Sequence, residues 1–134
     1  MTHEALARIA HLIRSQDNRA TDQPMFIVQE RKRDYGYDCD FCDDYVWLDT
    51  ENDYVEATAS EARKLESGKM NGRRWQKTGY KDRWEFVTAC FTEQGCKDFI
   101  AADGHNHGEL RIYAAGSYRN AEFRFVRSFI KAIE

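Results

Sequence analysis

A single proline, Pro24, and no long apolar run are the first features of this chain. A membrane-spanning helix needs about 18 or more consecutive apolar residues, and no window of the sequence approaches that length. Glu4, Arg8, Arg14 and Asp17 interrupt the apolar positions near the start of the chain, a pattern that differs from a signal peptide. We therefore expect a chain with no membrane contact, in the cytoplasm, where its four cysteines are reduced thiols.

The chain also lacks the motifs that would name a reaction. It contains no nucleophile elbow, no phosphate loop and no pair of acids at a diagnostic spacing. Cys42 or Cys90 with His105 and an aspartate would make a nucleophilic set, but any chain with these residue types supplies one by chance. We expect a protein that is not an enzyme and that carries no cofactor.

The cysteines give half of a metal motif. Cys39 and Cys42 have the two-residue gap that lets both sulfurs reach one tetrahedral zinc. The other ligands would have to come from His105, His107, Cys90 and Cys96. No second pair repeats the spacing, so we assign no metal site, and a small zinc-stabilised interaction module stays an alternative. The neighbouring acids would raise the pKa of these thiols, which argues against a redox role.

The net charge of −3 conceals two blocks of opposite sign. Residues 34–66, the acidic block, hold eleven acidic and two basic side chains, whereas residues 67–83, the basic block, hold six basic and one acidic. The two blocks could neutralise each other across a hairpin, or they could be faces of a surface that steers a charged partner. Both interpretations remain open at this point.

Hydrophobic periodicity predicts most of the secondary structure. Leu6, Ile9, Ala10 and Ile13 give a helix over 3–15. Further helices are expected over 58–67, over 92–103 with Thr92 as N-cap, and from 120 to 133 with Asn120 or Ser117 as N-cap. In the helix over 92–103, the buried stripe is expected to be Cys96, Phe99 and Ile100. Strands are expected over 24–29, 45–49, 80–91 and 110–114. The alternation over 80–91 indicates a central strand, or a strand with cover on both sides. Residues 35–44 are predicted to be a loop, and the polar segment 68–80 has no clear assignment.

The apolar stripe of the last predicted helix is expected to be its buried side. Its members are Ala121, Phe125, Val126, Phe129, Ile130 and Ile133. At 134 residues and 42% hydrophobic content, the chain is expected to form a single domain, 1–134. The elements predict an α+β two-layer sandwich, in which a mainly antiparallel sheet of about four strands packs against the N-terminal and C-terminal helices.

Two groups of residues are candidate binding sites. The acidic block would contact a protein partner through Asp38, Asp40, Asp43, Asp44, Asp49, Glu51 and Asp53. Carboxylates spread over a surface can also occupy a partner's groove that is built for a phosphate backbone, so mimicry of a nucleic acid is a further interpretation. The segment 72–77, with Tyr80 and Trp84, mixes cations and aromatics as nucleic-acid surfaces do. The acidic composition, with a pI near 5.8, makes direct nucleic-acid binding unlikely.

The second group lies where predicted strands and helices join. A helix N-terminus beside an arginine can hold an anion, such as the phosphate of a nucleotide signal. The candidate ligand-binding residues are His105, Asn106, Arg111, Tyr113, Tyr118, Arg119 and Asn120. A protein that sequesters a nucleotide signal is therefore the alternative function, and Arg119 pairing with Glu122 is the plain structural interpretation.

The C-terminal part of the chain resembles small uncharacterised proteins of tailed phages and bacterial prophages. The resemblance rests on DRWEFV (82–87), FTE (91–93), KDFI (97–100), GHN (104–106), RIYA (111–114) and YRNAE (118–122). Residues 34–80 have no match in it. The resemblance carries over no catalytic residue. It implies the cytoplasm of a bacterial host, where such accessory proteins are often stoichiometric inhibitors of defence, including anti-CRISPR proteins. The implied partner is a host protein or ribonucleoprotein complex.

Overall fold

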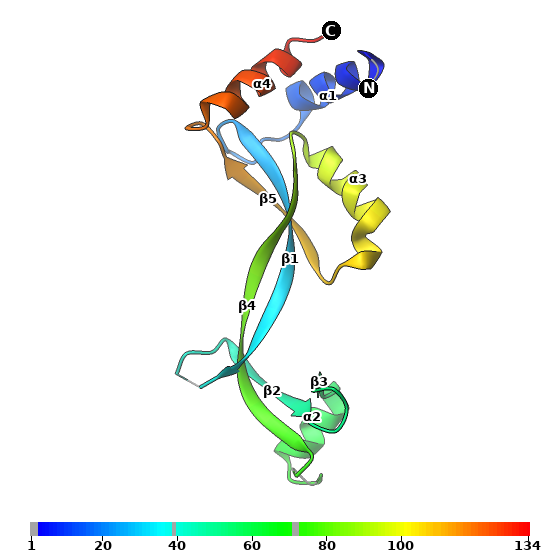
Figure 1. Cartoon of the computed structure of the whole chain (residues 1–134), viewed down its shortest axis with the longest axis vertical. Helices are drawn as coiled ribbons and strands as arrows, with labels where there is room; N and C mark the ends of the chain where they lie inside the picture. The colour runs from blue at the N-terminus through cyan, green and yellow to red at the C-terminus, as the bar shows by residue number, and fades with distance from the viewer. Residues whose placement is uncertain (1–2, 39, 71–72) are drawn as a thin grey trace. The chain divides into compact units, whose positions relative to one another are not determined.

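The computed structural model describes residues 3–38, 40–70 and 73–134 (Figure 1). The helices are α1 (His3–Ser15), α2 (Ala59–Glu66), α3 (Glu93–Asp103) and α4 (Ala121–Lys131), with a 3₁₀ turn η1 (Gly104–Asn106) after α3. The strands are β1 (Pro24–Tyr37), β2 (Asp44–Asp49), β3 (Val55–Glu56), β4 (Trp75–Cys90) and β5 (Leu110–Gly116).

The five strands form one sheet in the order β3-β2-β4-β1-β5. The β1–β5, β2–β3 and β2–β4 pairs are antiparallel, with Phe26 opposite Ala114 and Val46 opposite Thr78. The predicted α+β class with a mainly antiparallel sheet is confirmed, and β4 is a central strand as its sequence indicated.

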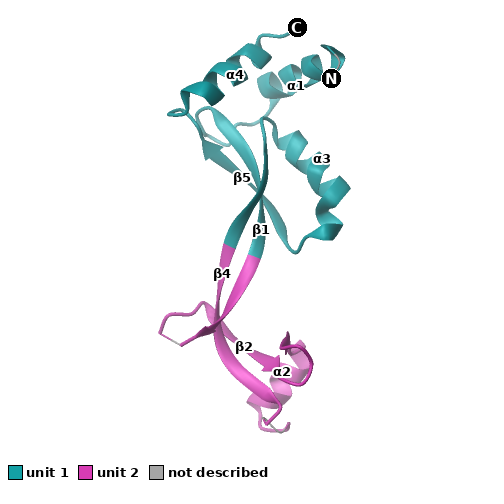
Figure 2. Cartoon of the chain, in the orientation of Figure 1, with its two compact units in different colours: residues 1–31, 84–134 teal, residues 32–83 magenta. Residues whose placement is uncertain are grey.

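Contacts along the chain divide it into two compact units (Figure 2). Unit 1 comprises residues 1–31 and 84–134, and unit 2 comprises residues 32–83. Strands β1 and β4 contribute residues to both units, whereas α1, α3, α4 and β5 belong to unit 1 alone. That the chain behaves as a single domain stays a prediction.

The core of unit 1 forms between one face of the sheet and α3. Phe26 and Val28 of β1 are fully buried, as alternate residues of a strand must be when one face is covered. Cys96 of α3 completes the buried cluster, and Phe99 and Ile100 of the same helix pack against it. The predicted stripe of this helix is therefore confirmed, and α3 is the helix that covers the sheet in unit 1.

Helices α1 and α4 pack against each other at one end of the strands of unit 1 (Figure 1). Ala10 and Ile13 of α1 are buried. The guanidinium of Arg14 donates to the carbonyl oxygens of Lys131 and Ile133, at 2.7 and 2.8 Å. A cation at these unpaired carbonyls stabilises the C-terminal end of α4.

The orientation of α4 corrects the prediction for its apolar stripe. Phe125 and Phe129 are 75% and 66% exposed, and Val126 is 38% exposed. The one fully buried side chain that the structure describes in α4 is Arg127. The ring of Phe123 stacks on the ring of Phe91, with 4.9 Å between the centroids. Arg127 lies one helical turn after Phe123, on the same side of α4, and therefore also faces inward. The predicted stripe therefore lies largely outside.

Strands β1 and β4 are both longer than predicted. β1 continues to Tyr37, through the start of the expected loop, and β4 begins at Trp75, inside the polar segment that had no assignment. Gly79 allows this local packing, because a Cβ at that position would collide with the carbonyl oxygen of Tyr37. Charged cross-strand pairs, rather than apolar alternation, hold these extensions in place.

Helix starts agree closely with the sequence. Thr92 and Asn120 accept hydrogen bonds from the backbone N–H groups of Gly95 and Phe123, as predicted for the two N-caps. Thr58 and Glu61 form a capping box at the start of α2. These local signals place the helices without reference to the rest of the fold.

The structure predicts a sharp contrast between two phenylalanines of unit 1. Replacement of the fully buried Phe26 by alanine should lower the free energy of unfolding by about 3–5 kcal/mol, because it removes the centre of the core. Phe86→Ala, at a side chain that is 62% exposed, should cost less than about 1 kcal/mol. Urea unfolding followed by circular dichroism measures both, and equal losses would contradict this core assignment.

Candidate functional site

The acidic and basic blocks pair with each other within unit 2. Arg74 donates to both carboxylate oxygens of Asp49, each at 2.6 Å, and this bidentate contact lowers the pKa of Asp49. Lys77 lies 2.9 Å from Glu66, and Arg83 lies 2.9 Å from Asp34. Mutual neutralisation, one of the two interpretations of the charge blocks, therefore accounts for several of these side chains.

A second charge cluster surrounds Arg33, which lies outside both blocks. Its guanidinium contacts Asp82 at 2.8 and 3.1 Å and Glu56 at 2.9 Å. It also lies over the ring of Tyr80, at 3.7 Å from the centroid. Tyr35 donates to Glu56 at 2.7 Å, and burial together with this carboxylate raises the pKa of Tyr35 to about 12. This cluster joins β1, β3 and β4 within unit 2.

The seven carboxylates predicted to contact a partner are not equivalent. Asp49 is buried beneath Arg74, and Asp43 accepts the backbone N–H of Asp82 at 2.7 Å. Glu51 lies 3.7 Å from Arg74. The six exposed members are Asp38, Asp40, Asp43, Asp44, Glu51 and Asp53. A contact through these exposed carboxylates stays a prediction. Cys39 lies outside the described residues, so the Cys39–Cys42 pair has no structural description.

The seven predicted ligand-binding residues fall at three places along β5. His105 and Asn106 lie in η1 before the strand, Arg111 and Tyr113 lie on the strand, and residues 118–120 follow it. The seven residues of β5 span about 20 Å at the usual rise of a strand. The structure therefore does not gather these side chains around one small ligand.

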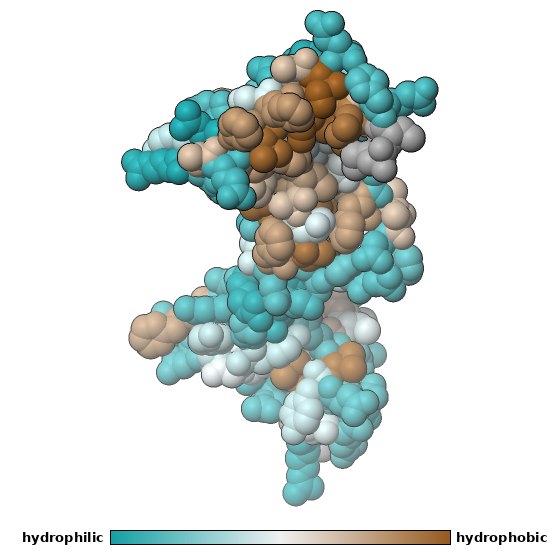
Figure 3. Space-filling view, turned by 45° about the horizontal axis from the view of Figure 1, so that its top comes forward, coloured by the Kyte–Doolittle hydropathy of each residue, from teal (hydrophilic) through white to brown (hydrophobic). Residues whose placement is uncertain are grey.

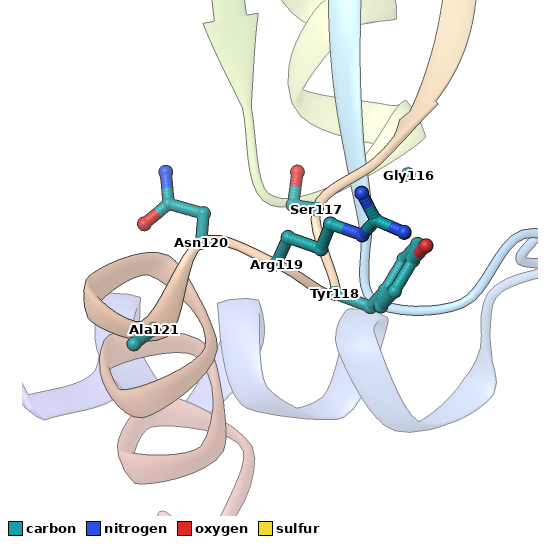
Figure 4. Close-up of a pocket in the computed structure, with 6 residues that line it drawn as sticks. All are labelled: Gly116, Ser117, Tyr118, Arg119, Asn120 and Ala121. Atoms are coloured by element: carbon teal, nitrogen blue, oxygen red, sulfur yellow. The ribbon is translucent and has the colours of Figure 1, made fainter.

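Residues 116–121 line an open hollow of about 630 Å³ at the start of α4 (Figure 4). Tyr118 and Arg119 lie close together, with the guanidinium 5.3 Å from the ring centroid, and Asn120 points away from them. The side chain of Asn120 accepts the N–H of Phe123 at 3.0 Å. Asn120 therefore serves as the helix cap, and the hollow is a broad surface feature rather than an enclosed pocket.

Among the described residues of unit 1, the face of the sheet opposite α3 is exposed along β5, where Tyr113 is 50% exposed, and we call it the open face. Arg111 and Tyr113 project to this side, because Leu110, Ile112 and Ala114 pack on the core side. The guanidinium of Arg111 lies 4.0 Å from the centroid of the Trp84 ring and donates to Gln29 at 2.8 Å. This open face carries exposed aromatic side chains beside a cation.

On the face of the molecule that Figure 3 shows, the most hydrophobic surface gathers over unit 1, and the surface of unit 2 is mainly hydrophilic. The most exposed apolar group on one helix is Phe125, Val126 and Phe129, which we call the outer face of α4. On the opposite side of this helix, Arg127 is only 4% exposed, and its Nη1 lies 3.5 Å from Gln23 Oε1. Helix α4 thus presents large apolar side chains to solvent while it buries a cation.

His107, named in the sequence only as a possible zinc ligand, forms a cluster with two carboxylates. Its Nδ1 lies 2.7 Å from Glu30 and its Nε2 lies 3.0 Å from Asp103. Carboxylates accept hydrogen bonds, so both ring nitrogens must donate and the imidazole is held in its charged form. These hydrogen bonds raise the pKa of His107. Both nitrogens are occupied, and the cluster therefore fixes the turn before β5 rather than serving as a general base.

Among residues 3–38, 40–70 and 73–134, no group of three or more His, Cys, Asp or Glu side chains is placed to hold a metal ion. Within the same ranges, every helix is too short or too polar to cross a bilayer.

The His107 cluster predicts a specific pH dependence. Because the folded state raises the pKa of His107, its contribution to stability is complete below the ordinary value of about 6.5 and is lost as pH rises through the raised value. The free energy of unfolding should therefore fall above neutral pH in the native protein, and His107→Gln should flatten this fall. His105→Gln, in the same turn, is the matched control. Identical slopes for native protein and His107→Gln in urea unfolding would contradict the assignment.

No family model, no curated protein and no solved structure matches this chain.

Proposed function

We propose that this chain is a non-enzymatic binding protein that inhibits a protein or ribonucleoprotein target in the cytoplasm of a bacterial host. The resemblance to phage and prophage accessory proteins suggests this context. A counter-defence role, of which anti-CRISPR inhibition is one form, follows from that resemblance. The observation that carries the proposal is the outer face of α4, whose apolar side chains are exposed in the part of the chain that the structure describes.

The outer face has the composition of a protein-binding surface. Phe125 and Phe129 stand one helical turn apart, so their rings project from the same side. Aromatic side chains supply much of the energy of protein interfaces, and a few such residues dominate binding. A helix that is apolar on both sides is normally covered on both sides. Among the described residues of unit 1, Phe123 packs on Phe91, whereas Phe125 and Phe129 are 75% and 66% exposed.

This assignment moves the main contact from the acidic block to α4. Asp49 is already paired with Arg74, and Asp43 is already hydrogen-bonded to the backbone of β4. A carboxylate that is paired internally offers less charge to a partner. The exposed Asp38, Asp40 and Asp44 remain able to contribute at the margin of an interface, where charges chiefly affect the rate of association.

Affinity capture from a bacterial lysate tests the proposal. Phe125→Gln with Phe129→Gln should weaken binding of the captured target at least about tenfold, because each large aromatic anchor is worth more than about 1–2 kcal/mol. Glu122→Gln with Lys131→Gln, two exposed polar positions of the same helix, should leave capture unchanged.

Salt separates the two contact surfaces in the same experiment. Binding through the outer face should persist at about 1 M salt, whereas binding through the acidic block should be lost as charges are screened. Capture that survives Phe125→Gln with Phe129→Gln but is abolished by Asp38→Asn with Asp40→Asn and Asp44→Asn would reject the α4 interface.

A further inference from the structure

Strand β5 is an edge strand with a regular row of outward backbone groups. It stands last in the sheet order, beside β1. The backbone N–H of Arg31 donates to the carbonyl of Glu109, and the N–H of Ser117 donates to the carbonyl of Gln23. In an antiparallel pair, hydrogen-bonded positions alternate. Residues 111, 113 and 115 therefore bond to β1, and residues 110, 112, 114 and 116 turn their N–H and C=O groups to the free edge.

This edge carries none of the usual features that prevent pairing. Residues 110–116 contain no proline and no lysine, and the one charged side chain, Arg111, is directed to Trp84 and Gln29 on the open face. Exposed edges are normally interrupted by proline, charge or a bulge, because unpaired backbone groups template another strand. The register of β5 with β1 is continuous from Pro24–Gly116 to Glu30–Leu110.

We propose that β5 pairs with the β5 of a second copy of this chain, antiparallel and centred on Tyr113. In this register Ile112 of one copy lies opposite Ala114 of the other, and Leu110 lies opposite Gly116. These are the positions whose backbone groups face the free edge, so they become hydrogen-bonded pairs. Tyr113 then lies opposite its own copy in a closely spaced pair, where two aromatic rings stabilise each other.

The sequence of β5 is complementary to itself in this orientation. Its first half, Leu110-Arg111-Ile112, is large, and its second half, Ala114-Ala115-Gly116, is small. The two-fold axis that relates the two copies passes through the Tyr113 pair, and it places each large side chain of one copy beside a small side chain of the other. Arg111 lies opposite Ala115, so the pairing creates no contact between like charges. A parallel arrangement in register would place each Arg111 beside its own copy.

The flanks of the strand add charge complementarity. Glu109, before β5, has a side chain that is 58% exposed, although it also pairs with Arg31. Arg119 follows β5 in the exposed loop that leads to α4. Antiparallel pairing brings the region before β5 of one copy next to the region after β5 of the other, and therefore brings opposite charges together. This self-complementarity favours a second copy over a strand from a different protein.

Sedimentation velocity over a range of concentrations tests the proposal on the full chain. The native protein should form a dimer. Tyr113→Lys should be monomeric, because it places two cations opposite each other at the centre of the pair. Ala114→Pro should also be monomeric, because it removes an outward N–H that β1 does not use. Circular dichroism establishes that each variant keeps its fold.

Phe86→Lys is the matched control, since it makes the same charge change at an exposed aromatic residue on β4 rather than on the edge strand. It should remain a dimer. A native protein that is monomeric up to about 1 mM overturns the proposal and leaves the edge to a foreign strand. A folded Ala114→Pro variant that stays dimeric, or dissociation by Phe86→Lys, also overturns it.

Discussion

One helix covers one face of the sheet in unit 1, and the rest of that unit depends on this constraint. Phe26, Val28 and Cys96 form a small core between β1 and α3. Helices α1 and α4 pack on each other at the end of the strands, and Tyr113 on the second face is 50% exposed. The open face, the outer face of α4 and the free edge of β5 are three consequences of the same arrangement. A partner, whether a second copy or a host protein, is the physical means by which such surfaces become buried.

Unit 2 is stabilised more by ion pairs than by a large apolar core. Its buried apolar residues are few, with Leu48, Leu65 and Trp75 among them. The guanidinium groups of Arg33 and Arg74 each bind carboxylates from neighbouring strands or turns. Replacing one partner of such a pair lowers stability, because the other charge is then left partly buried without its partner. Part of the acidic character of this segment is thus structural, and many of its exposed carboxylates lie in the loop before β2, at the start of β2 and in the turn after it.

Local signals in the sequence predicted local structure well. Thr92 and Asn120 were identified as caps, and the stripe of α3 was identified from Cys96, Phe99 and Ile100. The rotation of α4 could not be predicted, because the helix is apolar on both sides and only the contact between Phe123 and Phe91 decides which side is buried. The His107 cluster was also beyond the sequence, since Glu30 lies 77 residues away and meets His107 only through the register of β1 with β5. The seven candidate ligand residues were adjacent in sequence and separate in space for the same reason: a strand extends them.

The central claim is that unit 1 is completed along the free edge of β5 by a second copy of the chain. Hydrogen exchange of the β5 amides, measured by NMR at low and high protein concentration, tests it most directly. The amides of Arg111 and Tyr113 should be protected at both concentrations, because they bond to β1. The amides of Ile112 and Ala114 should exchange rapidly in dilute solution and become protected as concentration rises. Rapid exchange of Ile112 and Ala114 at every concentration would contradict the account.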